Sequence, residues 1–231
     1  MTMRNDPGPG TSAPPIVLFD WDGTLVDTGN LLLSCWHGAT QQVLGYRFPV
    51  EEEDRRRVLA MRAVDSFPTI TTGPDQTAEL AAAFDAEYEP RAPEHVYAHA
   101  GAAELLADLQ DRGIRMGVVT SKTAFRRAID GRASGLDDYF DVIVTGDDVS
   151  TGKPHPEGIL AAIGRLGGTP ENTVYVGDGP VDARAGKAAG VFTICITHGL
   201  HSHEELLDEN PDVIVSDMTG VQDAILEVLP A

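Results

Sequence analysis

Positive charge is scarce in this sequence of 231 residues. Seventeen Lys and Arg residues stand against 36 Asp and Glu residues, which gives a formal net charge of −19, and only three of the seventeen are lysines. A chain with this excess of negative charge and no long basic run is repelled by nucleic acid and by anionic membranes. We therefore expect neither nucleic acid nor a membrane as a partner.

Cysteines and long apolar runs are also scarce. Cys35 and Cys195 lie in unrelated apolar segments without a CxxC spacing, which argues against a disulfide framework and against a structural zinc site. No window reaches the roughly 20 continuous apolar residues of a membrane helix, and the N-terminus has neither the basic flank nor the apolar core of a signal peptide. These features predict a soluble, cytoplasmic protein.

Hydrophobic runs divide the rest of the chain. Residues 1–15 are rich in Gly, Pro, Ser and Thr without periodicity, and we interpret them as a disordered leader. Beyond them, short apolar, β-branched runs alternate with alanine- and leucine-rich helical stretches, which is typical of a parallel sheet covered on both faces. The sequence thus predicts an α/β, Rossmann-like fold with strands near 16–19, 114–119, 142–145, 173–177, 191–196 and 213–215.

One segment, residues 30–97, interrupts this alternation. It shows helical patterns separated by Pro and Gly, with no convincing strand among them. We therefore expect a small all-helical cap at 30–97, inserted into a core formed by residues 16–29 and 98–231.

Polar side chains follow the predicted strands, at the sheet edge where ligands of such folds bind. The first strand runs into Asp20 and Asp22, and the fourth into Asp178 and Asp182. The second strand runs into Thr120 and Ser121, and the third is followed by a turn with Lys153.

The acidic residues in this set predict a metal-assisted site. Two carboxylates as close as Asp20 and Asp22 repel each other, which favours an ionised nucleophile or metal ligand beside a protonated acid. Asp178 and Asp182 add further oxygens, and an oxygen donor set without His or Cys suits Mg²⁺ better than zinc.

The remaining strand-end groups suit phosphate. Lys153, the Thr120 hydroxyl and exposed backbone N–H groups could bind the oxygens of a transferring phosphoryl group. Lys122, one of the two other lysines, stays open between a contact in the site and a side chain that projects into solvent from a helix start.

Four motifs occur in order: DWDGTLVDT from Asp20, VVTSK through Thr120, GKPHPEG with Lys153, and VGDGPVD with Asp178 and Asp182. With them the chain resembles the haloacid dehalogenase-like (HAD) hydrolase superfamily over about residues 16–215. The helical segment matches the position of the mobile cap in its phosphoglycolate phosphatase and β-phosphoglucomutase branch.

The resemblance implies a role for each motif residue. Asp20 would be the nucleophile that becomes an aspartyl-phosphate, and Asp22 would protonate the leaving oxygen and then activate water. Thr120, Ser121 and Lys153 would form the phosphate-binding group. Mg²⁺ would be held by Asp20, the backbone carbonyl of Asp22 and Asp178, with Asp182 acting through water or by orienting Lys153.

Chemistry separates the branches of this superfamily. Asp22 argues against a dehalogenase, which needs no acid for its leaving group, and the absence of lysine from 30–97 excludes a phosphonoacetaldehyde hydrolase. Leu32 stands where β-phosphoglucomutases typically carry His. We therefore expect a phosphatase of small phosphorylated metabolites, phosphoglycolate phosphatase-like, acting as a monomer or homodimer. A β-phosphoglucomutase-like phosphomutase and a non-catalytic, phosphate-binding regulatory protein remain the alternatives.

Two departures from the branch pattern concern the substrate. Ser121 replaces the Asn that is usual after the motif threonine, and Ala63 replaces the Gly that commonly follows the cap arginine. Arg62 is the cap residue suggested to bind a substrate carboxylate. We interpret four histidines that follow no zinc spacing as surface or loop residues, namely His155, His198, His201 and His203.

Overall fold

The computed structural model describes residues 14–229 of the chain. The predicted leader at residues 1–15 lies almost wholly outside the described residues, so it stays a prediction. The cytoplasmic location and the oligomeric state also stay predictions.

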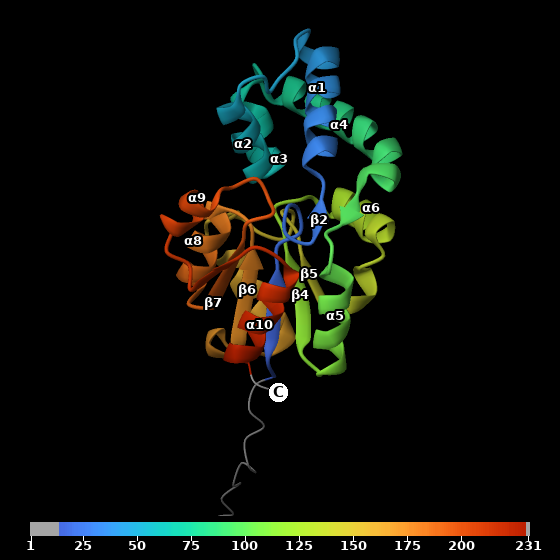
Figure 1. The fold of residues 1–231 in the computed structure, drawn as a ribbon. Helices are drawn as coiled ribbons and strands as arrows, with labels where there is room; N and C mark the ends of the chain where they lie inside the picture. Colours follow the sequence, from blue (N-terminus) through green and yellow to red (C-terminus); the bar gives the residue numbers. More distant parts are fainter. Residues whose placement is uncertain (1–13, 230–231) are drawn as a thin grey trace, which may run out of the picture.

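A six-stranded parallel sheet forms the centre of the molecule (Figure 1), with the strand order β5-β4-β1-β6-β7-β8. Its strands are β1 (Ile16–Phe19), β4 (Arg115–Val119), β5 (Val142–Val144), β6 (Thr173–Gly177), β7 (Phe192–Ile196) and β8 (Val213–Val215). The α/β, Rossmann-like prediction and all six predicted strands are confirmed, with boundaries shifted by one residue at most.

Side chains of β1 alternate between two hydrophobic cores, as the period of two in a strand requires. Val17 and Phe19 pack in one core together with helices α5 and α10, whereas Ile16 and Leu18 pack in the other with α7 and α8. The sheet is therefore covered on both faces. The helices between and after the remaining sheet strands are α5 (Ala102–Asp111), which precedes β4, and then α6 (Ala124–Ser134), α7 (Glu157–Leu166), α8 (Pro180–Ala189), α9 (His203–Leu207) and α10 (Met218–Val228).

Four further helices stand beyond the carboxyl ends of the strands (Figure 1). We call them the cap helices: α1 (Gly29–Leu44), α2 (Glu52–Ala60), α3 (Ala63–Ser66) and α4 (Pro74–His95). Their aromatic side chains pack together around Trp36, whose ring centroid lies 4.8 Å from that of Phe67 and 5.6 Å from that of Phe84. The helical character predicted for 30–97 is thus seen, while its separation from the core as a domain stays a prediction.

A small antiparallel ribbon joins the cap helices to the sheet. It pairs β2 (Val26–Asp27), which precedes α1, with β3 (Tyr97–Ala98), which follows α4. The chain therefore enters and leaves the cap helices at neighbouring positions. These two strands were not predicted, because two residues are too few to show a period.

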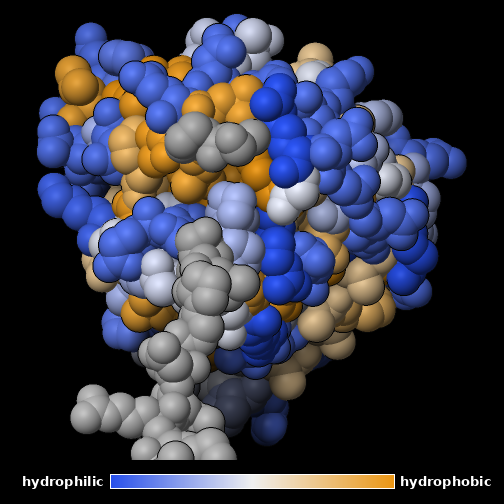
Figure 2. Space-filling view, turned by 90° about the horizontal axis from the view of Figure 1, so that it is seen from below, coloured by the Kyte–Doolittle hydropathy of each residue, from blue (hydrophilic) through white to orange (hydrophobic). Residues whose placement is uncertain are grey.

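The face opposite the cap helices is mostly hydrophilic, with a larger hydrophobic area in the upper left of the view and a smaller, paler one at the lower right (Figure 2). Among the described residues, no helix combines the length and the apolar character needed to cross a bilayer.

Candidate active site

A tight turn at the end of β1 places Asp20 and Asp22 at the carboxyl edge of the sheet. The backbone N–H of Asp20 still bonds the carbonyl of Val176 on β6, at 2.8 Å, and the chain then reverses at Gly23 with φ +76°. A Cβ atom at Gly23 would lie 2.4 Å from Oδ2 of Asp178. Glycine therefore supplies the left-handed backbone and lets Asp178 approach the turn closely.

The cavity at this edge has a volume of about 300 Å³. Its wall combines strand ends of the sheet with residues from α1 and α2. Seven of the eight predicted site residues line it, namely Asp20, Asp22, Thr120, Ser121, Lys153, Asp178 and Asp182. The structure thus brings together groups that lie up to 162 positions apart in the sequence, since residues 20 and 182 differ by 162.

Lys153 links two carboxylates at the base of this cavity. Its Nζ lies 2.7 Å from Oδ1 of Asp20 and 2.7 Å from Oδ1 of Asp182. Asp182 in turn accepts a hydrogen bond from the Tyr175 hydroxyl at 2.8 Å and one from the backbone N–H of Gly179 at 3.1 Å. Asp182 is thus held at the start of α8 in contact with Lys153, and its role in orienting this lysine stays a prediction.

Three carboxylates meet beside Lys153. Oxygen atoms of Asp20, Asp178 and Asp182 all lie within 4.8 Å of one another, and all three residues are buried. Burial raises the pKa of Asp20 to about 7, although Lys153 acts in the opposite direction. Burial and the negative charges of Asp182 and Asp20 raise the pKa of Asp178 well above its usual range. The site therefore holds more negative charge than Lys153 can balance.

This imbalance fits a divalent cation. Three ionised carboxylates and one ammonium sum to −2, and all three carboxylates offer the hard oxygen donors that Mg²⁺ prefers. Asp20 and Asp178 are the members that the sequence predicted as ligands. Asp182 lies within the same distance of the other two carboxylates, but it is already bonded to Lys153, Tyr175 and Gly179.

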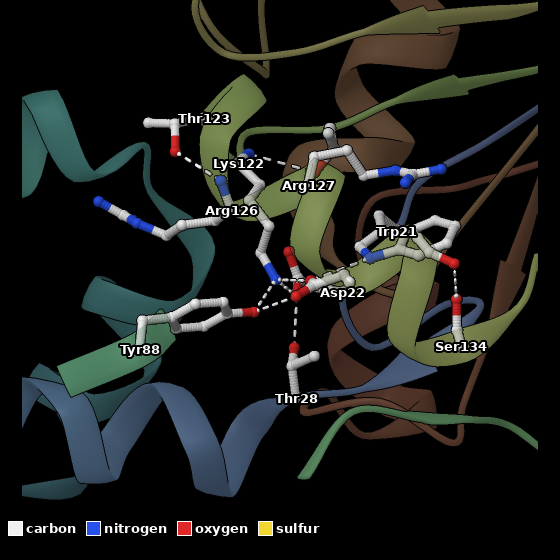
Figure 3. Close-up of polar contacts among 12 residues, drawn as sticks. Trp21, Asp22, Thr28, Tyr88, Lys122, Thr123, Arg126, Arg127 and Ser134 are labelled. Carbon is white, nitrogen blue, oxygen red and sulfur yellow. Dashed lines mark hydrogen bonds and ion pairs between the residues drawn. The ribbon is translucent and has the colours of Figure 1, made fainter. Parts of the chain in front are cut away.

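Asp22 faces a different set of partners from Asp20 (Figure 3). Its Oδ1 lies 2.6 Å from Nζ of Lys122 and accepts a hydrogen bond from the Thr28 hydroxyl. The Lys122 side chain is only 2 % exposed, so of the two alternatives left open for this lysine the structure shows a contact in the site and not projection into solvent. Burial alone lowers the pKa of Lys122, but Asp22, Tyr88 and Asp130 reverse the direction and raise it, so the ammonium stays charged.

The two predicted hydroxyl groups sit next to this network. Thr120 is buried, its N–H bonds the carbonyl of Val144 at 2.9 Å, and its Oγ1 accepts the N–H of Lys122 at 3.1 Å. Ser121 is half-buried on the cavity wall. Both residues directly follow β4, where the chain turns toward α6.

Arg62, the eighth predicted residue, lies outside the main cavity. Its guanidinium pairs with Asp65, with Nε 2.7 Å from Oδ2, and its Nη1 donates to the carbonyl of Val149 at 3.1 Å. It lines a small neighbouring pocket together with Gly152 and Lys153. Arg62 therefore connects α3 of the cap helices to the loop that leads into Lys153.

Three histidines contribute to the cavity wall. His198 and His201 lie in the loop after β7, as expected for loop residues, but they line the cavity, which the sequence did not predict. His99 stacks on His198 with ring centroids 3.9 Å apart, and the Nε2 atom of His99 has no hydrogen-bond partner among the described residues. Burial lowers the pKa of His99 to about 4.

Lys122 and these histidines are the site residues that sequence reasoning did not assign. For Lys122 a signal existed, because a lysine two positions after a strand-end threonine is unusual in a chain with three lysines. The histidines carry no such signal, since only the folded loop after β7 brings His198 to His99.

Comparison with known proteins agrees with this geometry. The family model for haloacid dehalogenase-like hydrolases matches residues 17–196. The pyrophosphatase PpaX of Bacillus pumilus is 32% identical over 206 residues, which cover 89% of this chain and 93% of that protein. The phosphoglycolate phosphatase of Salmonella paratyphi A is 31% identical over 237 residues, covering 93% and 91%.

A solved structure extends the likeness to three dimensions. A protein from Bacteroides fragilis, assigned as a haloacid dehalogenase-like hydrolase, superposes with a TM-score of 0.81 at 30% identity, covering 90% of this chain and 99% of that one. The family match spans well over half of the sequence and includes all four motifs. The chain therefore belongs to the haloacid dehalogenase-like hydrolases.

Proposed function

We propose that the protein is a Mg²⁺-dependent phosphatase, phosphoglycolate phosphatase-like, that hydrolyses small phosphorylated metabolites through an aspartyl-phosphate. One observation carries the proposal: Asp20 lies on the cavity wall beside Lys153 and within a buried cluster of three carboxylates. The names of the relatives, a pyrophosphatase and a phosphoglycolate phosphatase, support the same class of reaction.

In the first step, an oxygen of Asp20 attacks phosphorus while the bond from phosphorus to the leaving oxygen breaks. Asp22 supplies the proton that the leaving oxygen takes up, so that an alcohol departs. Lys153, Thr120 and Ser121 would bind the phosphoryl oxygens, where their positive charge and hydroxyl dipoles stabilise the negative charge of the transition state.

In the second step, a water molecule attacks the phosphorus of the aspartyl-phosphate. Asp22, ionised after the first step, takes the proton of that water, and the bond between phosphorus and Asp20 breaks. Inorganic phosphate leaves, and both carboxylates return to their starting states. Mg²⁺, held by Asp20, Asp178 and the backbone carbonyl of Asp22, would neutralise charge on the phosphoryl group throughout.

The part of the cavity wall that the cap helices contribute indicates which leaving groups fit the site. Leu32, Leu33 and Leu59 form its hydrophobic part, and Lys153 is the one Lys or Arg that lines this cavity within residues 14–229. A leaving group with a second negative charge would find no further cation there. We therefore infer that the preferred monoesters have an uncharged alcohol part, so that the likeness to phosphoglycolate phosphatases lies in the fold and the reaction and does not extend to phosphoglycolate as the preferred substrate.

A β-phosphoglucomutase-like activity is the alternative nearest in chemistry. Leu32 lines the cavity at the position where those mutases typically carry His, and none of the three lysines falls in 30–97. Both features favour transfer of the phosphoryl group to water.

The direct test is release of phosphate from p-nitrophenyl phosphate by the purified protein. We expect release with Mg²⁺, loss of release on addition of EDTA, and recovery when excess Mg²⁺ is restored. A panel of phosphorylated metabolites then ranks phosphoglycolate against sugar phosphates and neutral alkyl phosphates. No release with any divalent metal would favour the non-catalytic, phosphate-binding alternative.

A further inference from the structure

The carboxylate of Asp22 is anchored on one side. The contacts from Lys122 and Thr28 both fall on Oδ1, and the side chain is 22 % exposed (Figure 3). Oδ2 takes part in neither contact, so it is the oxygen that can exchange a proton with a substrate. The direction in which Oδ2 lies therefore depends on where Lys122 and Thr28 hold Oδ1.

Lys122 is itself fully held. An ammonium group has three N–H donors, and Nζ of Lys122 has three partners: Asp22 at 2.6 Å, the Tyr88 hydroxyl at 2.9 Å, and Oδ2 of Asp130. The side chain is 2 % exposed. Water thus has little access to the ammonium, and its position is set by the protein alone.

Asp130 keeps Lys122 paired whether Asp22 is ionised or protonated. The side chain of Asp130 is fully buried on α6 and is also bonded by the Trp21 Nε1–H at 3.2 Å. Its negative charge balances the ammonium without help from Asp22. When Asp22 carries a proton, the buried ammonium of Lys122 is therefore still paired with Asp130. Without Asp130 this ammonium would be a buried, unpaired charge, which costs free energy.

Tyr88 ties the same lysine to the cap helices. It lies on α4, is buried, and donates its hydroxyl proton to Oδ1 of Asp130 at 2.5 Å while accepting from Lys122. A shift of α4 away from α6 would remove one of the three partners of the ammonium. The position of Asp22 is thus connected to the docking of a cap helix.

We propose that Lys122 is a positioning residue that holds the Asp22 carboxylate for proton transfer, and that Tyr88 makes this hold depend on the docking of α4. The inference rests on the proposed function, because it takes Asp22 as the acid. It assigns Lys122 no contact with the substrate.

The test uses the leaving group. Glycerol 2-phosphate releases an alkoxide that needs a proton, whereas p-nitrophenyl phosphate releases a stabilised phenolate that needs none. The value of kcat/KM reports events up to departure of the leaving group. A loss of acid positioning therefore lowers kcat/KM for the alkyl ester much more than for the aryl ester.

The main variant is the double substitution Lys122→Met with Asp130→Asn, which removes both buried charges and leaves neither unpaired. We expect kcat/KM for glycerol 2-phosphate to fall by about 10²-fold or more, the range of general acid catalysis, and that for p-nitrophenyl phosphate by less than about 10-fold. Tyr88→Phe keeps the ring and should give the same pattern with a smaller loss. Asp22→Asn supplies the reference pattern for a missing acid.

The matched control is Lys187→Met, which replaces an exposed lysine of α8 that does not line the cavity. It should leave both values unchanged. Circular dichroism and thermal unfolding establish that each variant is folded. Equal losses on the two esters, or a rise in KM alone, would overturn the positioning role while the phosphatase proposal stands. No release of phosphate by the parent protein from either ester overturns both.

Discussion

Lys153 and Asp20 form a buried ion pair, with 2.7 Å between Nζ and Oδ1. The ammonium lies at the same distance from Asp182, so Asp20, Lys153 and Asp182 form a cluster of three charged groups. The oxygen that we propose as the nucleophile and the cation that we propose to bind the phosphoryl group thus lie side by side.

Asp20→Asn should abolish turnover while the fold persists. The amide is a very poor nucleophile, so we expect phosphate release from p-nitrophenyl phosphate to fall by at least about 10³-fold. Burial already disfavours the ionised form of Asp20, so a neutral side chain should cost little stability. The unfolding temperature checks this second point, and comparable activity in the variant would remove Asp20 from its role.

Asp178→Asn should weaken metal binding. A ligand that binds only the folded protein stabilises it by about 2.7 kcal/mol at a hundredfold excess over its Kd, so Mg²⁺ should raise the unfolding temperature of the parent protein. We expect the variant to need at least about 10-fold more Mg²⁺ for the same rise. Asp138→Asn, at an exposed position away from the cavity, is the control and should respond like the parent. An identical response of all three proteins would exclude Asp178 as a ligand.

Arg62→Ala should lower activity, because Arg62 connects α3 to the loop that leads into Lys153. The side chain is 13 % exposed and donates to the carbonyl of Val149, and a hydrogen bond from a charged group contributes about 1.5–3 kcal/mol. We expect kcat/KM to fall by about 10-fold. Arg57→Ala, which removes a more exposed arginine paired with Asp54, should show no change. Steady-state kinetics of both variants make the comparison.

The stability of the protein should respond to acid through His99. Its pKa is about 4 in the folded protein against 6.5 as the ordinary value, so between these pH values the unfolded chain binds a proton that the folded chain does not. The stability attributable to His99 is therefore complete above about pH 6.5 and is lost as pH falls toward 4.

His99→Phe isolates this contribution, because it keeps an aromatic ring against His198 and removes the titrating group. Unfolding temperatures measured from pH 7 to pH 4 should fall less steeply in the variant than in the parent protein. Parallel curves would show that His99 does not titrate in this way.

Local patterns in the sequence were sufficient for the sheet. Each strand is a short apolar run bounded by turn residues, and the carboxyl ends of parallel strands meet at one edge, so Asp20, Thr120, Lys153 and Asp178 could be placed together before the structure was known. The motif spacing and the resemblance to a known family supplied their roles, which stay predictions.

The environment of Asp22 could not be predicted in the same way. Lys122 meets Asp22, Asp130 and Tyr88 across 100, 8 and 34 positions of sequence respectively, and three different elements must pack before these contacts exist. The same holds for Arg62, whose partner carbonyl at Val149 is 87 positions away. Such contacts depend on tertiary packing, for which a single sequence offers no periodic signal.

The ribbon of β2 and β3 marks the two positions at which the cap helices could be exchanged for those of another protein. Val26 lies opposite Ala98, and Asp27 lies opposite Tyr97. The segment between Asp27 and Tyr97 therefore leaves the core and returns to it at neighbouring positions. A transplant of the intervening stretch from another protein would have to match this ribbon and also the contacts that Tyr88 and Arg62 make with the core. Recombination at these junctions would exchange the part of the cavity wall that α1 and α2 contribute while the strand-end residues stay in the chain, provided that the incoming stretch supplies equivalents of Tyr88 and Arg62.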